Sequence, residues 1–217
     1  MKNEDASEGS APCKVDFTLM YAFHDAFRRD LQRLGDAAAS GRAGAPAVRA
    51  GWATLKKQLH LHHSAEDTSI WPVLRAKITA PGDMVVIDRM EAEHASLDGL
   101  VVAVDVSLDG RNPVRVVAPV RALAAALVGH MDHEERDALP LIETYLGAQG
   151  WDAFRKEMRR TYGIRGGAEL FPWMLDGASA TTTGKVLRSL PPPARALYRM
   201  IWRPGYARTP RWEDTAA

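Results

Sequence analysis

Cysteine is almost absent from this sequence, and its scarcity excludes several kinds of site. The single thiol, Cys13, stands in a polar N-terminal stretch, so the chain can form neither an internal disulfide nor a zinc–thiolate site. No apolar run approaches the roughly 18 residues that a membrane-spanning helix needs. The first residues also lack the apolar core of a secretory signal. We therefore expect a cytoplasmic protein without a membrane span.

A strong excess of one charge is missing too, because 28 Lys and Arg balance 27 Asp and Glu. The total gives no argument for nucleic-acid binding, which we do not expect. The distribution is uneven, however. Residues 151–217 hold 12 basic and 6 acidic side chains, whereas residues 1–150 hold 16 basic and 21 acidic ones. This asymmetry indicates a separate module or a basic tail at the C-terminal end.

Apolar residues recur at helical spacing in four long segments, separated by turns that contain glycine or proline. The four segments span about residues 16–39, 47–77, 83–107 and 114–146. Short connections between long helices favour an all-α fold with an antiparallel up-down four-helix bundle. The expected organisation is a flexible segment at 1–15, the bundle at 16–148 and a short helical or irregular extension at 149–217.

The second and fourth segments contain an internal repeat with an offset of 68 residues. His62 and Glu66 match His130 and Glu134, and an acidic residue follows each Glu. A proline stands six positions after each Glu. His and Glu four residues apart on a helix point the same way, separated by about 40° around the axis. Each motif can therefore bind one metal ion or share a pair of ions.

A second pair of histidines has almost the same offset, since His24 and His94 are 70 residues apart. Each half of the bundle thus supplies one His followed by His-x-x-x-Glu. Leucines on the preceding turns place these motifs on the apolar faces of their helices. Burying six such polar groups without partners would cost about 1–3 kcal/mol each. A bound cation satisfies them together, so we favour a metal site over a polar core network.

The remaining histidines have no duplicated partner. His63 is opposite Met131 in the repeat, His133 is opposite Ala65, and His60 has no counterpart. We interpret His63 and His133 as outer or solvent-facing residues and His60 as an exposed one.

This pattern resembles the hemerythrin family, and specifically its bacterial HHE cation-binding branch. The resemblance covers about residues 16–146 and assigns the metal ligands to His24, His62, Glu66, His94, His130 and Glu134. It implies two iron ions in an oxo- or hydroxo-bridged di-iron centre. It also implies dioxygen, peroxide or nitric oxide as the small ligand. A redox partner is a separate expectation. The resemblance identifies no catalytic residue and no cofactor site beyond the metal ligands.

The chain departs from the oxygen-carrying hemerythrins at two positions. Those proteins have a second His four residues after the third-helix His, where this chain has Asp98. They also use an Asp five residues after the last His, where this chain has Glu135. We prefer Glu134 as the ligand because the repeat pairs it with Glu66, and we keep Asp98 and Glu135 as additional candidates. A more anionic ligand set favours Fe(III), which suits redox turnover better than reversible oxygen carriage.

These observations leave more than one function open. The leading hypothesis is a di-iron protein that interacts with dioxygen, peroxide or nitric oxide and decomposes peroxide. Whether it is an enzyme is undecided. The alternative is a non-catalytic iron- or oxygen-binding sensor whose basic tail contacts a partner. A metal-free interaction bundle is a third option, and a mixed or di-manganese centre stays open beside iron.

The basic tail at 185–211 interleaves seven Lys and Arg residues with Tyr198, Trp202 and Tyr206. One interpretation is a docking surface for an acidic partner, nucleic acid or an anionic membrane. The other is that the aromatic rings pack on the bundle while the Arg head groups stay in water. We favour packing.

Overall fold

The computed structural model describes residues 14–110 and 113–212. All secondary structure in these residues is helical, which confirms the predicted all-α class. None of the described helices is both long and apolar enough to cross a bilayer. The segment predicted to be flexible, including Cys13, lies outside the described residues except for its last two positions.

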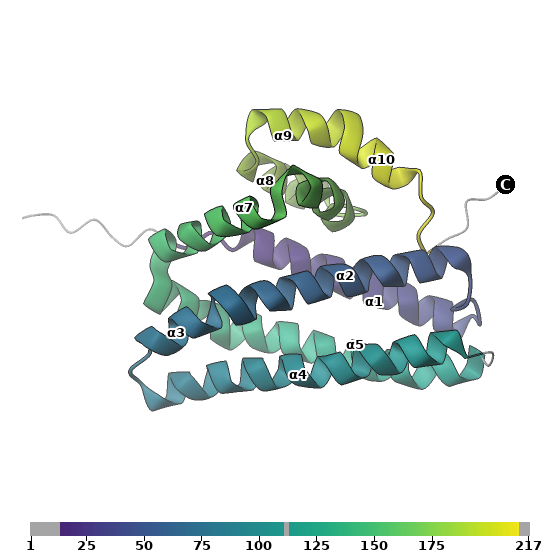
Figure 1. Ribbon diagram of the computed structural model, residues 1–217, viewed down its shortest axis with the longest axis horizontal. Helices are drawn as coiled ribbons and strands as arrows, with labels where there is room; N and C mark the ends of the chain where they lie inside the picture. Colours follow the sequence, from purple (N-terminus) through teal and green to yellow (C-terminus); the bar gives the residue numbers. More distant parts are fainter. Residues whose placement is uncertain (1–13, 111–112, 213–217) are drawn as a thin grey trace, which may run out of the picture.

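Four long helices lie side by side and the chain reverses direction from each to the next (Figure 1). They are α1 (Thr18–Ala39), α2 (Pro46–Ser69), α4 (Pro81–Asp109) and α5 (Val117–His133). The short helices α3 (Trp71–Lys77) and η1 (Pro113–Val116) precede α4 and α5 respectively. Helix α1 packs against α2 and α5, and α5 also packs against α4.

The duplicated proline interrupts the helix in both halves, just beyond each His-x-x-x-Glu motif. Pro72 stands at the start of α3, directly after the break that ends α2. Pro140 lies in α6 (Leu139–Leu141), between the wider π-helical turns η2 (Glu134–Ala138) and η3 (Ile142–Leu146). Proline has no backbone N–H and cannot continue the regular α-helical ladder. Each motif therefore lies next to a fixed irregularity in its helix.

The buried apolar residues form two clusters along the helices, and the polar motifs lie between them. On α1, Met20 belongs to one cluster and Phe27 to the other, with His24 between them. On α4, Met90 and Leu97 flank the corresponding histidine in the same way. Apolar side chains therefore flank the motifs above and below along the bundle.

The C-terminal extension consists of further helices that cover α1 and α2 on one side (Figure 1). These are α7 (Gly147–Met174), α8 (Ala180–Ser189), α9 (Pro192–Leu197), η4 (Tyr198–Trp202) and α10 (Arg203–Ala207). Helix α7 bends sharply at Gly163, whose φ of 57° lies in the left-handed region that favours glycine. The bend turns the second half of α7 back over the bundle.

The aromatic residues of the tail pack inward, as the sequence predicts. Tyr198 and Trp202 are only 5% and 9% exposed, while most of the basic side chains around them lie at the surface. Trp212 donates its backbone N–H to the carbonyl of Ala47 at 2.8 Å and lays its ring on Gly51. A Cβ at Gly51 would stand 2.4 Å from that ring, so only glycine fits there. The tail is therefore fastened to α2.

Candidate metal centre

Three buried side chains from different helices form the first cluster of candidate ligands. His24 on α1, His62 on α2 and Glu134 on η2 place donor atoms within 4.8 Å of one another. His24 and Glu134 are fully buried, and Nε2 of His24 lies 3.1 Å from Oε2 of Glu134. The wide turn of η2 begins at Glu134, so this carboxylate enters the bundle where the helix changes pitch.

The second cluster consists of His63, His94 and His130, which come from α2, α4 and α5. Their donor atoms also lie within 4.8 Å of one another, and all three side chains are buried. Nε2 of His94 and Nε2 of His130 are 3.2 Å apart. The rings of His63 and His94 stack with centroids 3.9 Å apart.

Two carboxylates span these clusters. Glu66 has Oε1 at 3.2 Å from Nε2 of His62 and Oε2 at 3.6 Å from Nε2 of His94. Glu134 lies beside His24 in the first cluster, and its Oε2 is 4.0 Å from Nε2 of His130 in the second. Each carboxylate thus has a histidine from either cluster as its neighbour.

The donor atoms have the spacing and the free valences of a metal site. Small divalent metal ions hold N and O donors at about 2.0–2.2 Å, so neighbouring donors of one octahedral ion lie roughly 3 Å apart. The contacts of His24 with Glu134 and of His62 with Glu66, at 3.1 and 3.2 Å, match that spacing. Nε2 of both histidines and all four oxygens of the two carboxylates are buried without a hydrogen-bond partner among the described residues. Buried polar atoms rarely remain unpaired, so the donor set fits a bound cation.

Comparison with protein-family models gives a match to the hemerythrin HHE cation-binding domain over residues 15–142. The chain belongs to this family. The match includes both clusters and ends before the extension formed by α7 to α10. Comparisons with curated proteins and with solved structures returned no match.

In this hemerythrin domain, three outer carboxylates orient the cluster histidines. Glu135 lies 2.7 Å from Nδ1 of His24, and Asp67 lies 2.7 Å from Nδ1 of His94. Glu93 lies 2.9 Å from Nδ1 of His130. A carboxylate that accepts the Nδ1 hydrogen leaves the Nε2 lone pair directed into the cluster.

The pKa values of the buried groups are shifted by burial and by the charges of their neighbours. Burial works against the charge of His24, but the carboxylates, Glu134 first, outweigh it and raise the pKa to about 9. Burial likewise opposes ionisation of Glu134, yet His24 outweighs it and lowers that pKa to about 2. Burial, and then the charge of Glu134, raises the pKa of Glu66 well above its ordinary value. The opposite shifts place a negative charge on Glu134 beside a cationic His24 and disfavour a second negative charge on Glu66.

The structure brings together all six residues that the sequence selected and places the two additional candidates elsewhere. Glu135 lies outside the cluster, where it contacts His24 and Arg28. Asp98 is exposed, so its position does not support the proposal of a further ligand there. The buried stripe of α4 passes through His94 and Leu97 with alternating steps of three and four residues. The position four beyond His94 therefore falls beside the stripe.

Sequence reasoning missed His63, which lies inside the second cluster instead of outside it. Consecutive residues on a helix are about 100° apart. Hence α2 presents His62 to one cluster and His63 to the other. His133 stays outside, where it bonds to Glu93 at 2.8 Å, and His60 is exposed as predicted. The repeat could not find His63, because its counterpart in the other half is a methionine.

Proposed function

We propose that the two clusters hold two iron ions within an up-down four-helix bundle formed by α1, α2, α4 and α5. The single observation that carries the proposal is that Glu66 and Glu134 each lie between histidines of both clusters. Two carboxylates in such positions are suited to bridge a pair of ions. We assign His24 and His62 to one ion and His63, His94 and His130 to the other.

The chemistry of the donors favours iron over zinc. Neither cluster contains a thiolate, and structural zinc sites are closed and four-coordinate. Imidazole nitrogens combined with carboxylate oxygens on facing helices are the ligand set of di-iron carboxylate bundles. A pair of bridging carboxylates also stabilises the higher oxidation state, because each adds negative charge.

We propose that the centre interacts with dioxygen, peroxide or nitric oxide, and that peroxide decomposition is its activity. The bound iron would supply the redox chemistry of these ligands. Among the chain's own residues, Phe23 and Phe27 pack on His62, with ring centroids 4.9 and 5.5 Å away, and shield part of its ring. Tyr162 donates its hydroxyl to the Leu61 carbonyl at 3.0 Å. Burial, and then the charge of nearby Glu66, raises the Tyr162 pKa to about 12, so the phenol keeps its proton at neutral pH.

A sensor with a free tail is less well supported. Its partner-binding arm would need unpacked aromatic residues, whereas Tyr198 and Trp202 are buried against the rest of the chain. The packed extension instead suggests a function confined to the domain and its covering helices.

Metal analysis tests the proposal directly. Protein from iron-replete cells should contain close to two irons per chain and absorb in the near ultraviolet. Glu66→Gln should lose most of this iron, whereas the matched variant His60→Ala should keep it because His60 is exposed. Absence of iron, together with no uptake of anaerobically added Fe(II), would refute the di-iron proposal. Rapid peroxide consumption per centre supports an enzyme, and stoichiometric binding supports a non-catalytic binder.

A further inference from the structure

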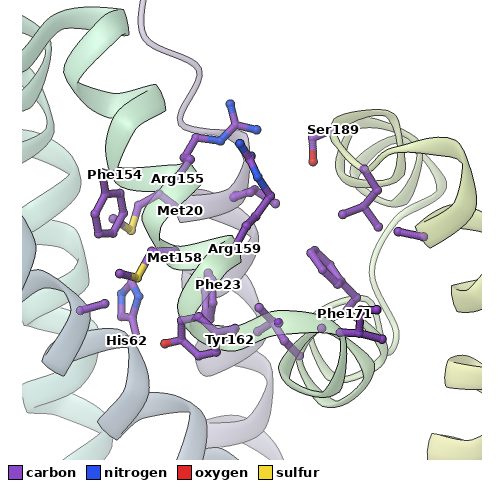
Figure 2. Close-up of a pocket in the computed structure, with 18 of the residues that line it drawn as sticks. Met20, Phe23, His62, Phe154, Arg155, Met158, Arg159, Tyr162, Phe171 and Ser189 are labelled. Atoms are coloured by element: carbon purple, nitrogen blue, oxygen red, sulfur yellow. The ribbon is translucent and has the colours of Figure 1, made fainter.

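A cavity of about 320 Å³ lies between the extension and the bundle, and this volume is within the size range of small-molecule sites. It is bounded by α1, by the bent helix α7 and by the segment that joins α8 to α9 (Figure 2). Its walls are mainly aromatic and aliphatic. The lining includes Met20, Phe23, Trp151, Phe154, Phe171 and Trp202.

The inner end of this cavity reaches the candidate metal centre. His62 and Glu66 both belong to its lining, and they are ligands proposed above for the two ions. Figure 2 shows His62 beside Met158 and Tyr162 in the cavity wall. A molecule that fills the cavity would therefore contact the edge of the centre.

Two arginines on α7 mark another part of the wall. Arg155 and Arg159 line the cavity, and Figure 2 shows their guanidinium groups together, away from His62. Nε of Arg155 is buried without a hydrogen-bond partner, and its NH1 has only a 3.3 Å contact to the exposed Asp152. Arg159 makes no ion pair with any described residue within 4.0 Å. These guanidinium groups have free donors at the rim of an apolar cavity.

Other charges near this rim are nearly balanced. Asp16 has a lowered pKa, chiefly because its carboxylate accepts a hydrogen bond from Thr18 and, to a smaller degree, because Arg155 and Lys185 are near. Asp16 and Asp152 carry two negative charges, whereas Lys185, Arg155 and Arg159 carry three positive ones. The rim therefore has one excess positive charge, so an anionic head group is complementary to it.

We propose that this cavity binds a medium-chain monocarboxylic acid. The carboxylate would pair with Arg155 and Arg159, since guanidinium groups bind carboxylates with well-directed hydrogen bonds. The acyl chain would lie along the apolar wall toward His62. A path for a diatomic gas would need neither this volume nor the two cations. Binding in the cavity does not depend on iron, but the consequence that the acid controls access to the centre rests on the proposed function.

Calorimetric titration with octanoate tests the proposal, with octanol as the uncharged probe of similar length. Octanoate should bind one per chain and more tightly than octanol. Arg155→Gln and Arg159→Gln should each weaken octanoate binding about tenfold to a hundredfold, the usual effect of removing a charged hydrogen bond, and leave octanol unchanged. Arg160→Gln is the matched control, because Arg160 is exposed, pairs with Glu157 and is not in the cavity wall.

A second variant tests the apolar part of the cavity. Met158→Trp should fill the space and abolish octanoate binding while thermal unfolding shows an intact fold. Equal binding of octanol and octanoate, or arginine variants without effect, would overturn the carboxylate assignment. The titrations are run on iron-loaded and iron-free protein. Octanoate binding without any iron uptake would support the carboxylate site and reject the di-iron centre. Iron uptake without octanoate binding would support the di-iron centre and reject the carboxylate site.

Discussion

Oδ1 of Asp67 on α2 lies 2.7 Å from Nδ1 of His94 on α4. The other half of the bundle contains the same arrangement, because Glu135 lies 2.7 Å from Nδ1 of His24. Each of these acids directly follows a cluster glutamate. The internal repeat therefore includes the acid after each motif, and each half of the bundle orients the single histidine supplied by the other half.

This symmetry predicts matched losses of metal affinity. Asp67→Asn and Glu135→Gln should each weaken iron binding about 10- to 100-fold, because the histidine loses the acceptor that fixes its tautomer and ring orientation. Competition with a chelator of known affinity measures the effect. Asp98→Asn serves as control and should bind like the unaltered protein, since Asp98 is exposed. A loss from Asp98→Asn equal to the other two would mean that the cluster extends along α4.

A second prediction separates the two neighbouring pairs of histidines. His63→Ala should lose iron from the second cluster, because the ring lies among His94 and His130. His133→Ala should keep most of its iron, since its ring bonds to Glu93 outside the cluster. Iron content per folded chain, measured on both purified variants, checks the assignment. Full iron content in His63→Ala would show that His63 is not a metal ligand, as the repeat suggested.

Iron binding should also depend on pH in a defined direction. In the metal-free protein His24 has a pKa of about 9 and therefore holds a proton at neutral pH, and the pKa of Glu66 is raised well above its ordinary value. Coordination needs these groups deprotonated, so binding releases protons and the affinity should rise as pH increases toward 9. Chelator competition between pH 6 and pH 9 should show about a tenfold gain or more per unit while His24 is still protonated. A flat profile would show that His24 does not bind the metal.

Periodicity and the repeat together predict the helices and six cluster residues because both depend on local spacing. Apolar stripes fix which face of each helix is buried, and the His-x-x-x-Glu spacing places both donors on that face. The same reasoning does not extend to Asp98. A residue four positions after His94 would lie near the same face of an isolated helix. The buried positions of α4 alternate in steps of three and four, so Leu97 is buried there instead of Asp98.

Features that join distant segments could not be predicted this way. The cavity exists because α7 bends at Gly163 and returns over α1, and nothing in the local pattern fixes that angle. The choice of partner for each outer acid is also tertiary: the sequence shows an acid after each motif, but only packing shows which histidine it meets. His63 needed the same information, since its role depends on the position of α4 and α5 relative to α2.

The last prediction concerns how the extension is held on the bundle. Trp173 on α7 is fully buried, and its Nε1 donates to Oδ2 of the buried Asp30 on α1 at 2.8 Å. Its ring also packs near Phe27, with centroids 5.1 Å apart, and Phe27 in turn contacts His62. Trp173→Ala should lower the free energy of unfolding by about 3–5 kcal/mol through lost packing.

Trp173→Phe keeps most of the ring and removes the donor to Asp30. It should cost about 1–3 kcal/mol, because one oxygen of a buried carboxylate loses its partner. Met200→Ala is the control, since Met200 is 69% exposed and should change stability little. Thermal and denaturant unfolding of the three variants measures the order of their stabilities.

A chain truncated after Gly150 should still contain all six ligands that the sequence selected. It should also expose the apolar surface around Phe27 and lose solubility. An equally stable Trp173→Ala protein, or a fully soluble truncated one, would show that the extension contributes little to the fold and leaves the metal centre to the bundle alone.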